Sequence, residues 1–354
     1  MTSKMATRID LSGGFTELAG WPEVTDVEVK RAPWSLDRIV DQAEPVILRG
    51  AAAHWDLVVH EGQSTAQLTA RLRAHAGERL ARCFVMTADG GGRFGYADEF
   101  DRFNYQVRSE PVDALLDRLS AAPSDEVVYA GSLPLDEFFP GLEARLRFPV
   151  GDSAPASANA FLWIGNGSRI AAHFDATHNL ACVIAGHRRF LLFPPEQVGN
   201  LYLGPLDRTP AGQPMSVVDF HNPDLGRFPR FSSAMAAASV AVLAPGDALY
   251  IPPLWWHHVE APRSLGAMVN YWWDDAAPWS DAPMNALLHG LLAIAHRPAA
   301  ERTAWSALFD HFVFTRAGGD PMAHLPVSVR GIAGQMDALS ARQLRARLLF
   351  ALNT

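Results

Sequence analysis

Between residues 155 and 275 the sequence breaks into short apolar runs separated by glycine, proline and asparagine. Many short strands punctuated by turn residues are typical of a sandwich or a barrel. We therefore predict a mainly β fold with a core at about residues 155–275. The expected strands lie at 161–164, 179–184, 190–193, 240–243, 248–251 and 267–273.

The flanking segments have other patterns. Ser35 is predicted to cap a helix that begins at Leu36, and residues 45–50 are predicted to form a short strand ending in a turn. Residues 199–232 are rich in proline, glycine and asparagine and predict a long loop, a feature that usually covers or forms a binding site. Periodicity predicts helices at 64–76, 111–120 and within 280–353, and a strand at 127–129.

Composition narrows the functional classes. The 354 residues carry a formal net charge of -8 and no run of lysine or arginine, so no nucleic-acid partner is expected. Cys83 and Cys182 are isolated and predict neither a disulfide framework nor a thiolate metal site. No signal-peptide pattern and no stretch of about 20 apolar residues is present, so we expect a cytoplasmic protein with no membrane partner.

The main candidate for chemistry is a metal site. His173 and Asp175 flank Phe174, and residues 245–258 predict a turn and a strand that carries His257 and His258 at its end. Alternate residues of a strand share a face, so His173 and Asp175 should project together and His178 should face away. Two histidines and one carboxylate that leave metal positions open are typical of non-haem Fe(II) oxygenases.

Simpler interpretations exist for the same residues. His173 and Asp175 could form a hydrogen-bonded pair at a strand end, in a β-sandwich that binds no metal. Trp255 and Trp256 are more often core residues than substrate contacts. Since neighbouring strand residues face opposite sides, only one of His257 and His258 should be a ligand. The Pro-Gly-Asp turn and the Trp-Trp-His-His run favour the metal interpretation.

These motifs together resemble the cupin-like JmjC oxygenases, and most closely the branch that contains the asparaginyl hydroxylase of the hypoxia-inducible factor. The likeness covers about residues 30–275. It is carried by residues 172–179, 186–195, 222–224, 227–229 and 245–258, and by 45–50 together with Trp55.

The resemblance implies a double-stranded β-helix (a jelly roll, or cupin, core) with flanking N-terminal α/β elements and C-terminal helices. It also implies Fe(II), 2-oxoglutarate as cosubstrate, and O2. The implied catalytic metal ligands are His173, Asp175 and His257. Positions that match cosubstrate-binding residues are Tyr129, Asn179 and Asn270.

Two positions depart from the resembling family. Arg188 stands where the nearest relatives have a lysine for the distal carboxylate of 2-oxoglutarate. A guanidinium can bind a carboxylate through two hydrogen bonds, so Arg188 is a cofactor-binding candidate. The alternative is a surface arginine in a turn beside Gly186. Ile170 replaces a threonine, so the contact of that threonine with the cosubstrate should be lost.

The implied function is hydroxylation of a protein side chain or a small molecule, with succinate and CO2 as coproducts. The presence of Asp175 favours hydroxylation over halogenation. The alternative is a cupin that binds metal without oxidation, as a sugar-binding, isomerase-like or regulatory protein. We expect an oxygenase domain over residues 1–279 and a helical region over 280–354. In the resembling hydroxylase such helices form a homodimer; here they could do so or pack on the β core.

Overall fold

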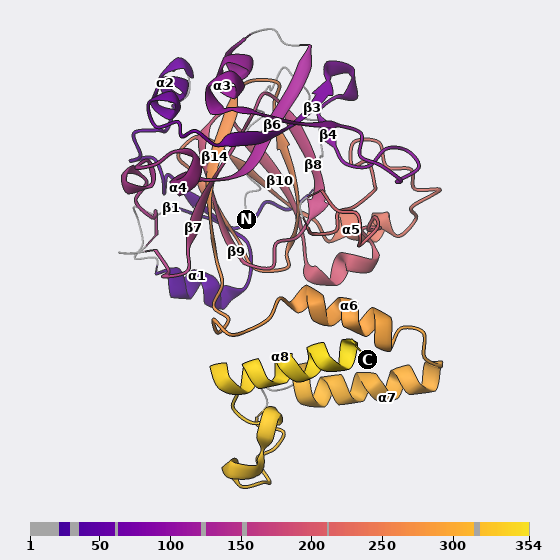
Figure 1. Cartoon of the computed structure of the whole chain (residues 1–354). Coiled ribbons are helices and arrows are strands. Elements are labelled where there is room, and N and C mark those ends of the chain that lie inside the picture. The colour runs from indigo at the N-terminus through magenta and orange to yellow at the C-terminus, as the bar shows by residue number, and fades with distance from the viewer. Residues whose placement is uncertain are drawn as a thin grey trace, which may run out of the picture. The chain divides into compact units, whose positions relative to one another are not determined.

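The structure is a computed structural model that describes residues 21–28, 35–60, 63–121, 125–150, 154–210, 212–314 and 319–353. The chain divides into two compact units, one ending at Asp274 and the other beginning at Asp275. The first unit holds two β-sheets, and the second holds helices drawn in orange to yellow in Figure 1. The predicted mainly β fold is confirmed.

The larger sheet has nine strands in the order β1-β2-β12-β9-β14-β7-β6-β3-β5. The smaller sheet has five, in the order β11-β10-β13-β8-β4. From β7 to β14 the chain passes repeatedly from one sheet to the other, as in a double-stranded β-helix. In the larger sheet the bounds are β1 (Asp26–Glu28), β2 (Val46–Arg49), β3 (Leu80–Thr87), β5 (Gln106–Pro111), β6 (Glu126–Pro134), β7 (Asn159–Gly165), β9 (His178–Ala185), β12 (Ala248–Ile251) and β14 (Gly266–Trp273). In the smaller sheet they are β4 (Arg93–Phe94), β8 (Ser168–His173), β10 (Arg188–Phe193), β11 (Ser239–Leu243) and β13 (Trp256–Ala261).

Strand β9 shows how the core is built. It is flanked by β12 and β14, and nearly all of it is buried. Leu180 and Ile184 pack in a cluster that also contains the helical residues Leu68 and Leu115. Side chains alternate along a strand, and Val183 instead joins a cluster with residues of the smaller sheet. One face of the nine-stranded sheet is therefore covered by N-terminal helices, and the other faces the five-stranded sheet.

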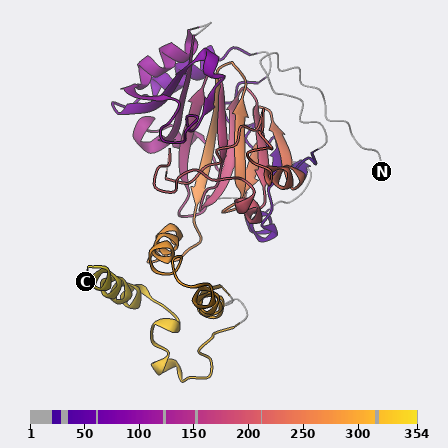
Figure 2. The ribbon, with the colours of Figure 1, turned by 90° about the vertical axis from the view of Figure 1, so that its right-hand side faces the viewer.

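The N-terminal helices follow their sequence patterns. The side chain of Ser35 accepts a hydrogen bond from the backbone N–H of Arg38, which caps the first helix as predicted. Helices α2 and α3 lie side by side near β3 in Figures 1 and 2. The helices of the first unit are α1 (Leu36–Gln42), α2 (Ala66–Ala74), α3 (Val112–Ser120), α4 (Leu135–Phe138) and α5 (Phe231–Ala236).

Two segments of the family resemblance meet at one end of the larger sheet. Arg49 Nη1 lies 2.8 Å from Asp247 Oδ2, and the backbone N–H of Gly50 donates to Asp247 Oδ1 at 2.9 Å. Gly246 has a φ of +96°, and a Cβ there would lie 3.1 Å from Ala53. Glycine is therefore required both by the turn and by the close approach of the chain. This contact fixes the turn that leads into β12.

The second unit contains α6 (Pro283–Ala293), α7 (Ala299–Phe309) and α8 (Ala338–Leu352). Asp337 and Ser340 form a reciprocal capping box at the start of α8. Among the described residues of this unit, Ala341 is the one buried hydrophobic residue. Leu348, Leu349 and Leu352 of α8 are exposed. None of the helices in the described part of the chain is long and apolar enough to cross a membrane.

Candidate metal centre

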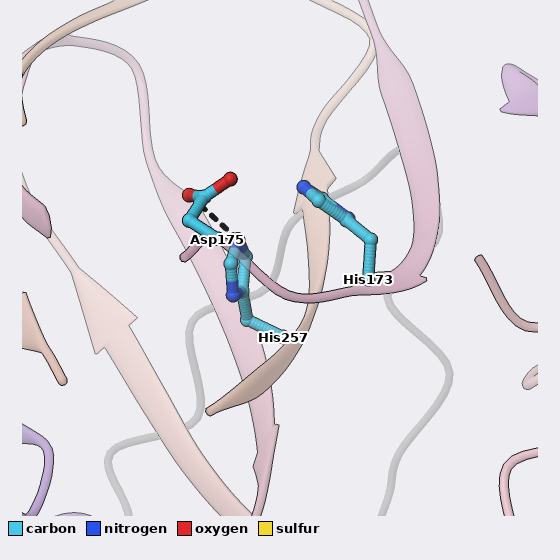
Figure 3. A group of neighbouring side chains, drawn as sticks. All are labelled: His173, Asp175 and His257. Atoms are coloured by element: carbon cyan, nitrogen blue, oxygen red, sulfur yellow. Dashed lines mark ion pairs between the residues drawn. The ribbon is translucent and has the colours of Figure 1, made fainter. Parts of the chain in front are cut away.

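Three side chains from two strands and one connection converge on a single point. His173 is the last residue of β8, Asp175 lies in the connection that follows, and His257 is in β13. His257 stands directly opposite His173 in the antiparallel pairing of these strands. The potential ligand atoms of all three residues lie within 4.8 Å of one another. Figure 3 shows the three side chains as neighbours in the site. His257 Nε2 is 3.6 Å from Asp175 Oδ2.

Two details of the predicted geometry are wrong. Asp175 does not share a strand with His173, because β8 ends at His173, and Asp175 reaches the site through the turn of the chain. The strand after the 245–247 turn does not carry His257 at its end, because β12 ends at Ile251. Prolines follow and Leu254 has a φ of +66°, so the ladder breaks there and β13 starts in the other sheet. The N–H of Leu254 donates to the backbone oxygen of Asp175 at 2.8 Å, which joins the two turns.

The two histidines are oriented for metal binding. The Nδ1 atom of His173 lies 2.9 Å from the carbonyl oxygen of Ala171, and that of His257 lies 3.1 Å from the oxygen of Trp255. A carbonyl can only accept, so both Nδ1 atoms carry the hydrogen and both Nε2 lone pairs are free. Burial, with a contribution from His173, lowers the pKa of His257 to about 4. His257 is therefore neutral at pH 7, the form that coordinates a metal.

A relay of hydrogen bonds holds Asp175. Trp163 Nε1 donates to Asn270 Oδ1 at 2.5 Å, Asn270 Nδ2 donates to Asn179 Oδ1 at 3.3 Å, and Asn179 Nδ2 donates to Asp175 Oδ2 at 3.1 Å. An indole N–H can only donate, so Trp163 sets the direction of the whole relay. The two asparagines expected near the cosubstrate thus orient the carboxylate ligand.

An irregularity in β8 decides which side chains face the site. His257 pairs with His173 and Val259 pairs with Ile170, so two residues of β8 stand opposite His258 alone. Strict alternation would put Ile170 and His173 on opposite faces. With the extra residue, a β-bulge, both line the same pocket. His258 has no contact with this pocket, so the structure separates the two adjacent histidines.

The pocket around the three side chains has a volume of about 190 Å³ and mostly aromatic and aliphatic walls. Among the described residues that line it, Asp175 is the one carboxylate, and none is a lysine or an arginine. The 199–232 segment contributes Pro210, Gln213 and Met215 to the wall, as expected for a functional loop. The other lining residues are Phe84, Phe94, Tyr105, Tyr129, Ser132, Trp163, Ile170, Asn179, Phe190, Val259, Met268, Asn270 and Trp272.

Sequence reasoning missed most of this wall. Trp256 packs in the core against Phe174, with ring centroids 4.8 Å apart, and Trp255 is not among the lining residues. Trp163 and Trp272 line the pocket instead, although no motif marks them. Trp163 could have been found from the strand register only if the pairing of β7 with β14 were known. His178 donates to or accepts from Tyr250 Oη at 2.8 Å and stacks on Trp273, away from the three converging side chains.

Arg188 is buried, so the interpretation as a surface arginine is wrong. It is 3% exposed, and no carboxylate of the described residues forms an ion pair with it. A Cβ on Gly266 would lie 2.4 Å from Arg188 Nη1, so the glycine makes room for the guanidinium. Burial lowers the pKa of Arg188 to about 10. Burial also raises the pKa of Tyr129, and the positive charge of Arg188 acts in the opposite direction on that pKa. A buried cation of this kind provides a binding site for an anion.

A second group of three potential ligands differs from the first. His221, His258 and Glu260 also bring their ligand atoms within 4.8 Å of one another. Both Nε2 atoms contact Glu260 Oε1, at 2.6 and 2.9 Å, and Arg189 Nε donates to Glu260 Oε2 at 2.9 Å. The Nδ1 of His258 is buried and has no partner among the described residues, whereas a metal-bound histidine donates its other N–H. These contacts favour metal binding at the first group alone.

Comparison with known proteins agrees with this architecture. A family model described as a cupin-like domain matches residues 33–277, and the chain belongs to this family. Lysine-specific demethylase 8 of Danio rerio is 27% identical over 242 residues, which cover 66% of this chain and 54% of that protein. tRNA wybutosine-synthesizing protein 5 of Homo sapiens is 29% identical over 192 residues, 49% of this chain and 58% of that protein.

HSPB1-associated protein 1 of Homo sapiens is 37% identical over 115 residues, 31% of this chain and 22% of that protein. The chain thus spans 22–58% of the length of these three relatives. With its fold and its His-Asp-His group, the chain is a cupin-like protein of the JmjC type.

We expect His173→Ala to abolish stoichiometric binding of Co(II), used as an oxygen-stable probe for Fe(II), because it removes one of three ligands. His178→Ala is the matched control, since it removes a histidine and its hydrogen bond with Tyr250 but no candidate metal ligand. Absorption titration of the full chain measures both. Equal Co(II) affinity in the wild type and in His173→Ala would contradict the site.

Proposed function

We propose that this protein is a hydroxylase that couples oxidation of 2-oxoglutarate to succinate and CO2 with hydroxylation of a protein side chain or a small molecule. The observation that carries the proposal is the convergence of His173, Asp175 and His257 in one pocket. Two imidazoles and one carboxylate fit Fe(II) and leave positions open for other ligands.

Bound Fe(II) would supply the activation of O2 and the redox chemistry. The chain itself holds the ligand atoms in place: backbone carbonyls fix the two imidazoles, and the relay from Trp163 fixes Asp175. The largely apolar walls exclude water from the reacting groups. The retained carboxylate of Asp175 supports hydroxylation rather than halogenation.

The cosubstrate is proposed to lie between the metal ligands and Arg188. Arg188 lacks a carboxylate partner among the described residues, and Tyr129, whose pKa responds to both Arg188 and Asp175, lines the pocket. A dianion with carboxylates at both ends fits this arrangement, one end at the metal and the other at Arg188. Guanidinium to carboxylate pairing supplies the charge and the hydrogen bonds.

The substrate group is proposed to be uncharged. The wall that surrounds the metal ligands is built from aromatic, aliphatic and neutral polar side chains. A charged group would lose its hydration there without gaining a partner. An uncharged side chain of a polypeptide or an uncharged small molecule suits the pocket, and the acidic chain does not favour a nucleic acid.

A cupin that binds metal without oxidising a substrate is the alternative. Such a protein needs the three metal ligands. It does not need a buried cation without an acidic partner, such as Arg188, because it binds no 2-oxoglutarate. Arg188 therefore favours the oxygenase.

We further propose that the C-terminal helices form a homodimer. With Ala341 as the one buried hydrophobic residue in the described part of the second unit, these helices have almost no core of their own. Leu292, Phe314 and Phe350 are 73%, 69% and 74% exposed, a degree unusual for large apolar side chains. A second copy would cover them.

The first prediction concerns turnover. Purified protein with Fe(II), O2 and 2-oxoglutarate should form succinate slowly without a primary substrate, and His173→Ala should reduce the rate to background. Mass spectrometry of succinate measures it. No succinate, together with no binding of 2-oxoglutarate to the metal-loaded protein by calorimetry, would favour the non-oxidising cupin.

The second prediction concerns Arg188. Arg188→Ala should raise the KM for 2-oxoglutarate by roughly 10-fold or more, since a charged hydrogen bond contributes about 1.5–3 kcal/mol. Arg188→Lys should retain part of the affinity because it keeps the charge. The assay is succinate formation against 2-oxoglutarate concentration. An unchanged KM in Arg188→Ala would assign carboxylate binding to another residue.

The third prediction concerns assembly. Leu349→Glu places a charge on the exposed face of α8 and should convert a dimer to a monomer, as measured by light scattering with size-exclusion chromatography. Gln343→Glu adds the same charge at an exposed polar position of α8 and should leave the dimer intact. A monomeric wild-type protein would refute the dimer and indicate that the helices pack on their own chain.

A further inference from the structure

A buried ionic cluster lies on the opposite face of β13 from the metal centre. It consists of Arg189, His221, His258 and Glu260, and we call it the outer-face cluster. His257 and Val259 line the metal pocket, so the alternating residues His258 and Glu260 point away from it. The cluster therefore sits directly behind a metal ligand.

Glu260 is the centre of the outer-face cluster. It is fully buried, and it faces Arg189 in the register of β10 and β13. Arg189 Nε, His258 Nε2 and His221 Nε2 all contact its carboxylate, at 2.9, 2.9 and 2.6 Å. Burial acts to raise the pKa of Glu260, but the hydrogen bonds of the two histidines and the charge of Arg189 hold it well below its usual range. Glu260 is therefore a buried anion whose position is fixed by its donors.

Three of these residues belong to the sheet, whereas His221 belongs to the 199–232 segment. Next to His221, Phe220 stacks on the ring of His258 with centroids 4.6 Å apart. The segment is thus attached to β13 by a short hydrogen bond and by an aromatic contact. Both attachments are on residues within three positions of His257.

The same segment is attached to the strand of the other histidine ligand. The backbone N–H of Ser216 donates to the carbonyl oxygen of Ala172 at 2.7 Å, and Met215 forms an isolated bridge with His173. Met215 also lines the metal pocket, as do Gln213 and Pro210. One stretch, residues 212–221, therefore contacts the pocket, β8 and β13.

We propose that His221 and Glu260 are positioning residues, which brace the 212–221 stretch across β8 and β13 and so hold His173 and His257 at the separation that the metal requires. The inference rests on the proposed metal centre, and it assigns no ligand role to the outer-face cluster. Hydrogen-bond partners that lie behind metal ligands commonly change metal affinity by about 10- to 100-fold when they are removed.

His221 offers the cleaner test because it is partly exposed and lies outside the sheet. His221→Ala in the full chain should weaken Co(II) binding by roughly 10-fold and shift the Co(II) absorption bands, which report ligand geometry. His221→Gln keeps a donor for Glu260 and should restore the affinity to within about twofold. Wild-type protein should bind one equivalent of Co(II), since the outer-face cluster is not a second site.

Arg230→Ala is the matched control. It removes the hydrogen bond of Arg230 to Gly199 and its contact with the Tyr202 ring, which tie the same segment together without reaching β8 or β13. Its Co(II) affinity should equal that of the wild type. Circular dichroism verifies the fold of each variant. If His221→Ala does not fold, His221→Gln is compared with the wild type instead, and it should retain the Co(II) absorption bands of the wild type.

The outcomes separate the two proposals. Co(II) binding that survives His173→Ala refutes the metal centre itself. Binding that is lost in His173→Ala but unchanged in His221→Ala keeps the metal centre and overturns the positioning role. An equal loss in His221→Ala and Arg230→Ala also overturns it, because general loosening of the segment would then explain both.

Discussion

The pairing of His257 with His173 across β8 and β13 is the constraint on which the site depends. These residues are far apart in the sequence, and only the antiparallel register places their imidazoles next to each other, with ring centroids 4.3 Å apart and ring planes inclined by 56°. The register is in turn fixed by the apolar residues of both strands and by the neighbouring pair β10 and β13. A shift by one residue would turn the ligands out of the pocket.

Strand β13 separates two kinds of polar chemistry by its two faces. On the pocket face, the Nε2 atoms of the two imidazoles are left to face the metal position because their Nδ1 atoms donate to backbone carbonyls. On the outer face, the imidazoles of His221 and His258 donate hydrogen bonds to Glu260, and Arg189 balances the charge of this carboxylate. The same residue types thus form a metal site where the N–H groups point to backbone carbonyls, away from the site. They form an internal ionic network where the N–H groups point to a carboxylate.

The sequence predicted what depends on local patterns. The cap at Ser35, the turn at Gly246 and the strands of the core follow from turn chemistry and apolar runs. The ligand candidates and Arg188 came from motifs and family resemblance. The relay from Trp163 and the outer-face cluster could not be predicted, because they require knowing which strands are neighbours. The break after Ile251 was missed because Leu254 gives no sign of a positive φ.

The bulge in β8 has a consequence for how the length of this strand can vary. Ala171 and Ala172 together occupy the space opposite His258. Deletion of one alanine would place Ile170 two positions before the histidine, a spacing at which regular alternation keeps both side chains on the pocket face. The histidine ligand would therefore keep its orientation in a strand that has lost the bulge. Loss of both alanines would instead make the two residues neighbours on opposite faces of the strand, so that one of them would turn out of the pocket.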